Sequence, residues 1–364
     1  MAKFGIKSAD AGRVLNQGKF GGWSLCIGAG TSLPLFPTWQ ELVQGLLTSG
    51  PNALSPPDAK SLRDSFPPEA LIRASQELLA LDDEKFREYL TDTLYSHLRS
   101  EASGSWLTIA RCLMARVPGN VLASEWEQFW SFISSRHTTS AELAEVILES
   151  VEKEKAPNAI LSFNAEPLLF SLINAQAALR FRARKRIPKE DDMQSGPGVV
   201  DRIEGSTSWA KKGRIPYYFC HGFLPIVLTR SEAPWGEPSA AIESKMVFSE
   251  SDYLSLANMV LSWQSSVFIR SAMSDRTVFV GLSLTDPNMR RWLAWLYSQR
   301  LHEIQARNPR VRDSTQHLWI NRTSGSPQTD RWTEALVSNL GVRLVWIDQW
   351  RDTAAILREM LALM

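Results

Sequence analysis

Residues 23–32 read WSLCIGAGTS and decide the fold class of this 364-residue chain. The apolar run 23–27 is typical of a strand buried on both faces, and Gly28-Ala29-Gly30 predicts a tight turn directly after it. Thr38 is then an N-cap signal for a helix that begins at Trp39 and carries apolar residues on one face. A strand, a glycine turn and a helix in this order predict the first half of a βαβ unit.

Short apolar runs alternate with helical patterns over most of the remaining chain. The runs interpreted as further strands are 159–163, 216–220, 245–249, 277–284, 317–321 and 342–347. Helices are expected after three of them, from Glu250 to Phe268, from Pro287 to His302 and over 353–363. Such alternation predicts an α/β fold: a Rossmann-like parallel sheet of six or more strands, with helices on both faces.

Residues 51–155 depart from this alternation and are mainly helical in pattern. Helices are expected at 61–64, 70–81, 83–98, 106–115 and 141–155. We therefore predict a mainly helical insertion at 51–155, between the two parts of a Rossmann-like domain at 1–50 and 156–364. The stretch 119–124 fits either a strand of the sheet or part of the insertion. The polar segment 180–213, which opens with RFRARKR, is interpreted as an exposed loop.

Composition excludes several classes of protein. Lys and Arg total 40 against 39 Asp and Glu, so the net charge of +1 gives no overall signal for nucleic-acid binding. Cys26, Cys112 and Cys220 include no Cys-x-x-Cys pair and cannot assemble a four-cysteine zinc site. No stretch approaches the roughly 20 apolar residues of a membrane span, and no secretory signal is recognised. We expect a cytoplasmic protein with no membrane contact.

Polar residues at the ends of the expected strands are the candidates for function, because open parallel sheets bind ligands beyond the carboxyl ends of their strands. Each candidate also has an ordinary structural interpretation. A single Gly-x-Gly occurs in many turns, Asn164 suits a turn or cap, and His221 suits a hydrogen-bonded structural histidine. The positions are Gly28 to Ser32, Asn164, His221, Gly281 to Ser283 with Asp286, and Asn321.

In combination and in order, these motifs resemble the SIR2-like proteins, a sirtuin-related group frequent in bacterial anti-phage defence. The segments that carry the resemblance are GAGTS at 28–32 with Pro34, PTW at 37–39 and Leu42, SFNAE at 162–166, FCHG at 219–222, SE at 249–250 with Tyr253, and VGLSLTDPN at 280–288. The resemblance runs from about Ser24 to the last strand and helix. It implies a Rossmann-like NAD-binding domain whose helical insertion varies between members.

The resemblance also implies roles for single residues. It places Asn164 at the nicotinamide ribose and makes His221 the catalytic histidine. Glu166 departs from the family, which usually has Asp there, so its expected contact near the nicotinamide is open. Asp286 matches a family motif residue without an assigned role. The residues expected to contact NAD are Gly28, Ala29, Gly30, Thr31 and Ser32 at the diphosphate, Glu166, Gly281 and Ser283 in a sirtuin-like turn, Asp286, and Asn321 at the adenosine ribose.

The expected activity follows from the cysteine count, which is too low for the zinc module of sirtuin deacylases. Sirtuin deacylases carry four zinc-binding cysteines, so deacylation is disfavoured and no metal is expected. NAD is instead expected as a substrate that is hydrolysed to nicotinamide and ADP-ribose, with NAD depletion serving anti-phage defence. Nicotinamide departs neutral, so the protein must supply positioning, a polar environment and a base. The alternative is a non-catalytic NAD or ADP-ribose sensor or scaffold subunit of a defence complex.

Partners are expected because an unrestrained NAD hydrolase would harm its host. The resemblance implies a homo-oligomer and a regulating protein, such as a HerA-like ATPase or an Argonaute-type protein. The surface near Trp292 and Trp295 and the 51–155 insertion are candidate contacts, although single tryptophans are more often core residues. A weaker hypothesis gives the Arg180–Arg186 run a nucleic-acid contact, which would depend steeply on salt.

Overall fold

A seven-stranded, entirely parallel sheet forms the centre of the chain in a computed structural model that describes residues 22–50, 52–183, 198–226, 228, 232, 247 and 262–363. The strand order is β3-β4-β2-β1-β5-β6-β7. The predicted α/β, Rossmann-like fold is confirmed. The strands are β1 (Trp23–Ile27), β2 (Ala159–Ser162), β3 (Val200–Ile203), β4 (Ile215–Phe219), β5 (Arg276–Val280), β6 (His317–Arg322) and β7 (Val342–Ile347).

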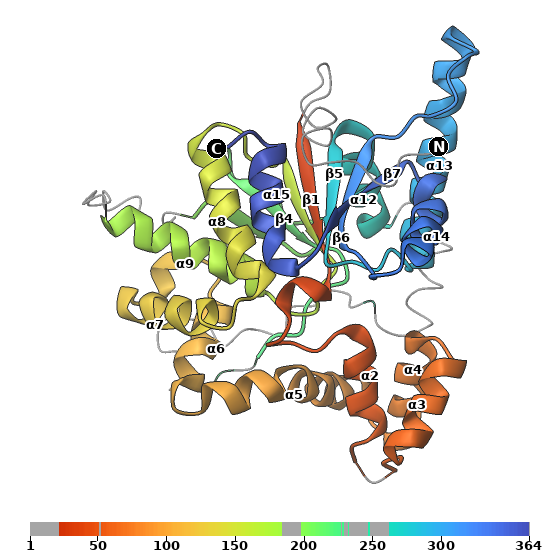
Figure 1. The fold of residues 1–364 in the computed structure, drawn as a ribbon. Helices are drawn as coiled ribbons and strands as arrows, with labels where there is room; N and C mark the ends of the chain where they lie inside the picture. The colour runs from red at the N-terminus through yellow and green to blue at the C-terminus, as the bar shows by residue number, and fades with distance from the viewer. Residues whose placement is uncertain are drawn as a thin grey trace.

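Helices cover both faces of the sheet (Figure 1). One face carries α8 (Thr139–Glu152), α9 (Leu168–Ala183) and α15 (Thr353–Met360), and the other carries α12 (Trp263–Ser274), α13 (Pro287–Arg307) and α14 (Pro327–Ser338). The remaining helices are α2 (Trp39–Leu47), α3 (Pro56–Ser65), α4 (Pro68–Leu79), α5 (Asp83–Ala102), α6 (Trp106–Met114) and α7 (Ala123–Ser134), with the short 3₁₀ segments η1 (Ala29–Ser32), η2 (Ser103–Ser105), η3 (Pro118–Asn120) and η4 (Trp350–Asp352).

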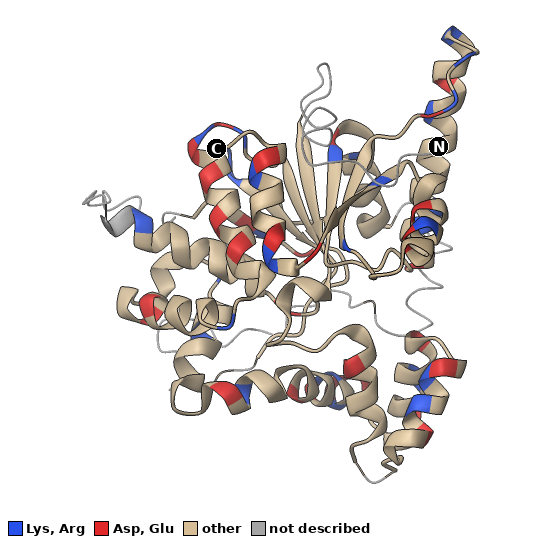
Figure 2. Ribbon diagram, in the orientation of Figure 1, with Lys and Arg blue, Asp and Glu red and all other residues tan. Residues whose placement is uncertain are grey.

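Burial on both faces explains why four of the five residues of β1 are apolar, while the fifth, Ser24, donates a hydrogen bond to Asp275. All five of its residues are buried, with Leu25 and Ile27 in the hydrophobic cluster of one face and Cys26 in that of the other. Alternate strand residues point to opposite faces, so a doubly covered strand needs apolar side chains throughout. Figure 2 shows most charged residues on the helices and few on the strands.

The order of strands places a topological switch point beside β1. From β1 the chain adds β2, β3 and β4 on one side and β5, β6 and β7 on the other. The chain after β1 leads to α8 on one face and the chain after β5 leads to α13 on the other, and open α/β sheets bind ligands at such a point. Figure 1 shows that β1 ends on the side of the sheet where α2 to α5 lie.

The helical region between β1 and β2 joins this end of the sheet through α5. Tyr95 donates a hydrogen bond from its hydroxyl to the carbonyl of Leu224 (2.9 Å), in the segment after β4, and meets Phe36 edge-on with ring centroids 5.4 Å apart. Tyr95 is fully buried in these contacts. Helix α8 instead packs against α9 and α15 over the sheet. The domain boundary at residue 155 remains a prediction.

Several local expectations need correction. Of the two alternatives left open for 119–124, the structure shows the one without a strand: Pro118-Gly119 enters a 3₁₀ turn and α7 begins at Ala123. Residues 200–203, expected in a loop, form the edge strand β3, whose Val200 and Ile203 are buried while its two central residues are half-buried. The strand expected at 277–284 ends at Val280. The expected strand 245–249, apart from Val247, and the expected helix start at Glu250 lie outside the described residues.

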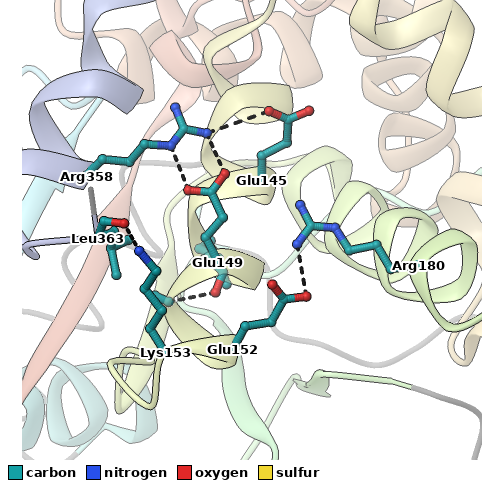
Figure 3. A network of polar contacts seen from close by, with 9 residues as sticks. Glu145, Glu149, Glu152, Lys153, Arg180, Arg358 and Leu363 are labelled. Atoms are coloured by element: carbon teal, nitrogen blue, oxygen red, sulfur yellow. Dashed lines mark hydrogen bonds and ion pairs between the residues drawn. The ribbon is translucent and has the colours of Figure 1, made fainter. Parts of the chain in front are cut away.

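Ion pairs tie the helices of one face together (Figure 3). Arg358 of α15 makes a two-fold contact with Glu149 of α8, from Nε to Oε2 (2.7 Å) and from Nη2 to Oε1 (2.9 Å). Its Nη2 also lies 3.7 Å from Glu145 Oε2. Arg180 of α9, the first residue of the basic run, pairs with Glu152 of α8 (3.3 Å). Arg180 therefore contributes to helix packing.

Candidate functional site

Two turns meet at the switch point, one after β1 and one after β5. The amide of Gly28 donates to the carbonyl of Val280 (3.1 Å), and the amide of Gly30 donates to the carbonyl of Gly281 (3.0 Å). A Cβ added to Gly281 would lie 2.6 Å from the backbone nitrogen of Thr31, and Gly281 has a φ of +67°. Only glycine fits this position without strain. The glycines thus allow the two turns to touch.

The same contacts reduce the number of backbone amides in the turn at 28–32 that can bind a phosphate. The amides of Gly28, Gly30 and Thr31 already donate to protein carbonyls, the last to that of Gly28 (3.0 Å). These three amides cannot donate to an anion while they hold those carbonyls, and the 3₁₀ pattern of η1 engages the amide of Ser32 within the segment. The expected diphosphate contact through the whole turn stays a prediction.

Asn164, directly beyond β2, is held by Glu166. Asn164 Nδ2 donates to Glu166 Oε1 (2.8 Å) and approaches Ser32 Oγ (3.3 Å) and Thr31 Oγ1 (3.4 Å). Asn164 is 2% exposed. Its Oδ1 is buried and accepts no hydrogen bond from the part of the chain that the structure describes. One end of the carboxamide is therefore fixed, and the other presents an acceptor that a bound hydroxyl group or water can satisfy.

Glu166 is surrounded by donors on both carboxylate oxygens. Oε1 accepts from Asn164 Nδ2 and from Ser32 Oγ, and Oε2 accepts from the amide of Leu168, the first residue of α9. Burial raises the pKa of Glu166 to about 7, although these three hydrogen bonds act to lower it. Through the hydrogen bond that it accepts from Nδ2, Glu166 orients the Asn164 carboxamide. Its expected contact with NAD stays a prediction.

A second pair forms between His221, beyond β4, and Asp286, the N-cap of α13. His221 Nε2 lies 3.5 Å from Asp286 Oδ2, and Asp286 Oδ1 accepts from the amides of Asn288 (2.8 Å) and Met289 (3.1 Å). Burial acts to raise the pKa of Asp286, but the hydrogen bonds from His221 and the two amides hold it below its ordinary value. Phe163 meets the imidazole edge-on, with centroids 4.7 Å apart.

The structure thus brings most of the predicted residues into two clusters. Gly28 to Ser32, Asn164 and Glu166 form one, with Gly281 against the glycine turn, and His221 with Asp286 forms the other. Ser283 and Asn321 have local contacts: Ser283 Oγ lies 2.7 Å from Thr285 Oγ1, and Asn321 Oδ1 accepts from the amide of Arg322 (3.0 Å). Ser249, Glu250 and Tyr253 lie outside the described residues.

Two residues near the clusters were not singled out from the sequence. Ser140, in the first turn of α8, has its Oγ 3.4 Å from Ser32 Oγ and is fully buried. Nothing in the sequence of α8 marks it, since its role depends on where the helix starts against the sheet. Phe163 stood in the quoted motif, yet its ring contact with His221 depends on the pairing of β2 with β4.

Residues 185–343 match the family model for the SIR2-like domain. The chain carries a SIR2-like domain. The match includes His221, Gly281, Ser283, Asp286 and Asn321, and the first glycine turn and Asn164 lie before it. No curated protein matches the chain.

A SIR2-like domain indicates NAD-related activity. Cys26, Cys112 and Cys220 are all buried, free cysteines. None of the helices in the described residues is both long and apolar enough to cross a membrane.

Proposed function

We propose that the protein hydrolyses NAD, releasing nicotinamide and ADP-ribose. The observation that carries the proposal is the Asn164 carboxamide, whose Nδ2 is anchored on Glu166 while its buried Oδ1 takes no hydrogen bond from the described residues. It stands beyond β2, next to the switch point. An acceptor in this place suits a ribose hydroxyl or the attacking water. The resemblance of the motifs around it to SIR2-like proteins supports NAD as the substrate.

Asn164 and His221 have different roles in a single displacement reaction at the ribose. Water forms a bond to C1′ of the nicotinamide ribose, and the pair of electrons in the C1′–N bond leaves with nicotinamide, whose ring nitrogen becomes neutral. Asn164 Oδ1 orients the water or the adjacent hydroxyl, which contributes through positioning. His221 accepts the proton that the water loses and passes it to solvent. No general acid is required, because the leaving group departs uncharged.

The proposal extends to a role in anti-phage defence through NAD depletion, regulated by self-association or by a partner protein. Support comes from the family resemblance. Exposed tryptophans offer a contact surface: Trp295 of α13 is 53% exposed and Trp332 of α14 is 72% exposed, whereas Trp292 belongs to the core. During infection, NAD is expected to fall in cells with the wild-type protein and to stay constant with Asn164→Ala.

Product analysis tests the activity itself. Purified protein is incubated with NAD, and nicotinamide and ADP-ribose are quantified by chromatography for the wild type, Asn164→Ala and His221→Ala. His302→Ala, at an exposed position of α13, is the matched control. Both site variants are expected to lose release by about 100-fold or more while folding normally, because base catalysis alone contributes about 10²–10⁴-fold. Wild-type rates in folded site variants would refute the proposal, and NAD binding without release would favour a sensor.

A further inference from the structure

Asp286 divides its carboxylate between two tasks. Oδ1 caps α13 by accepting from the amides of Asn288 and Met289, and Oδ2 faces His221 Nε2 at 3.5 Å. The cap fixes the carboxylate, since both of its amide contacts belong to the rigid first turn of a long helix. Asp286 is therefore held in one orientation against the imidazole. Its side chain is 17% exposed and that of His221 13%, so the pair is largely shielded from water.

The imidazole is held from a second side as well. The Phe163 ring lies edge-on to it, with an interplanar angle of 81°. Phe163 follows β2, His221 lies beyond the neighbouring strand β4, and Asp286 lies beyond β5, on the other side of β1. Three strand ends thus converge on one histidine. A single buried contact could be incidental, but a carboxylate and an aromatic ring from different strands together fix the position of the ring.

We propose that Asp286 is the positioning residue of His221 and sets the tautomer in which Nε2 carries the proton. Because an ionised carboxylate only accepts hydrogen bonds, the nitrogen facing it must be the donor. The lone pair of the neutral imidazole is then on Nδ1, and Nδ1 is the atom that accepts the substrate proton. The carboxylate also stabilises the imidazolium that results. Catalytic hydrogen bonds are often long in enzymes without substrate and tighten in the complex with it. The inference rests on the proposed function for its catalytic consequence only.

Asp286→Asn separates the two tasks. Asparagine is as good an N-cap as aspartate, and its single oxygen satisfies the amides of Asn288 and Met289. Its NH₂ group then faces His221 Nε2, which must become an acceptor, so the proton moves to Nδ1 and the base is lost. The opposite rotamer would set the NH₂ against two backbone donors. The substitution thus reverses the tautomer and leaves the helix intact.

Two measurements test the inference on the full chain. The first is nitrogen NMR of histidine-labelled protein, with His221→Gln assigning the His221 signals. The wild type is expected to show protonated Nε2, and Asp286→Asn protonated Nδ1. The second is the kinetics of nicotinamide release: in Asp286→Asn, kcat is expected to fall about 100-fold or more, the size of a general-base contribution, with KM within about 3-fold of wild type.

Control variants separate capping from positioning. Asp82→Asn changes the cap of α5, an exposed helix start whose Asp accepts from the amide of Lys85, and should leave both measurements unchanged. Asp286→Ala should lower both the thermal midpoint and kcat. The same tautomer in the wild type and Asp286→Asn overturns the inference. A reversed tautomer in a protein whose wild type does not hydrolyse NAD supports the inference and refutes the proposed function.

Discussion

Replacing Glu166 by Gln is expected to invert the Asn164 carboxamide. Glutamine has one acceptor oxygen, whereas the Glu166 carboxylate uses Oε1 for Asn164 and Ser32 and Oε2 for the amide of Leu168. If the glutamine oxygen faced Asn164, its NH₂ group would oppose the Leu168 amide and leave a buried donor unpaired, at about 1–3 kcal/mol. If the oxygen faces Leu168, the NH₂ can donate to Ser32 Oγ and to a rotated Asn164 Oδ1. The outward end of the Asn164 carboxamide is then still the group without a described partner, as in the wild type.

The second arrangement costs less, and it has a consequence for activity. Rotation of the carboxamide puts the Asn164 NH₂ where the buried Oδ1 stood. A donor then replaces the acceptor offered to the ribose or water, and the loss of one hydrogen bond of about 1.5–3 kcal/mol in the transition state corresponds to about a 10–100-fold fall in kcat. Stability should change by less than about 1 kcal/mol, since the rotation exchanges one unpaired buried group of Asn164 for another and leaves no additional group unpaired.

Nicotinamide release and thermal unfolding are measured on the same preparations of wild type, Glu166→Gln and Glu41→Gln. Glu41 belongs to the exposed capping box of α2, and its variant should keep full activity. The double variant Asn164→Asp with Glu166→Gln returns an oxygen to the outward position and should recover part of the lost rate. A stable Glu166→Gln protein with the kcat of the wild type would refute this account of how Asn164 is held.

Three further predictions concern stability. Gly281→Ala meets backbone at 2.6 Å and should destabilise far more than Gly325→Ala, which shares a positive φ (+80°) but has nothing within 4 Å; urea unfolding that gives equal losses would contradict the contact between the two turns. Burial lowers the pKa of His317 from 6.5 to about 3, so between those values the unfolded chain binds more protons and stability should fall as pH drops, by up to about 1.4 kcal/mol per pH unit; urea midpoints at several pH values should show a flatter slope for His317→Gln. Arg358→Met should cost about 1–2 kcal/mol in thermal unfolding because it removes a partly buried two-fold contact, and Arg73→Met, in an exposed i,i+4 pair, below about 0.5; equal costs would argue against the network of Figure 3.

The sequence predicted the doubly covered strands well because burial on both faces demands apolar residues throughout. The edge strand β3 was not predicted, because Asp201 and Arg202 interrupt its apolar pattern. An edge strand needs only some of its side chains buried. Helix α9 was not predicted for the opposite reason. It packs against α8, α7 and the sheet side, and apolar residues around most of its circumference give no helical period.

The candidate site was predictable in its parts but not in its contacts. Motif order located Asn164, Glu166, His221 and Asp286 at strand ends. The bond between Glu166 and Asn164 spans two residues, yet it depends on the turn that the chain makes between β2 and α9. The pairing of His221 with Asp286 depends on the strand order, which alternation of strands and helices does not specify. Side-chain contacts across a sheet therefore had to come from the structure.

Hydrolysis of NAD in heavy-oxygen water tests the central claim most directly. The purified wild-type protein is expected to form nicotinamide and ADP-ribose in equal amounts, with one heavy oxygen from water in each ADP-ribose, and Asn164→Ala protein of normal fold is expected to form neither above background. ADP-ribose formed equally by Asn164→Ala, or no ADP-ribose from wild-type protein that binds NAD, would contradict the claim that this site hydrolyses NAD.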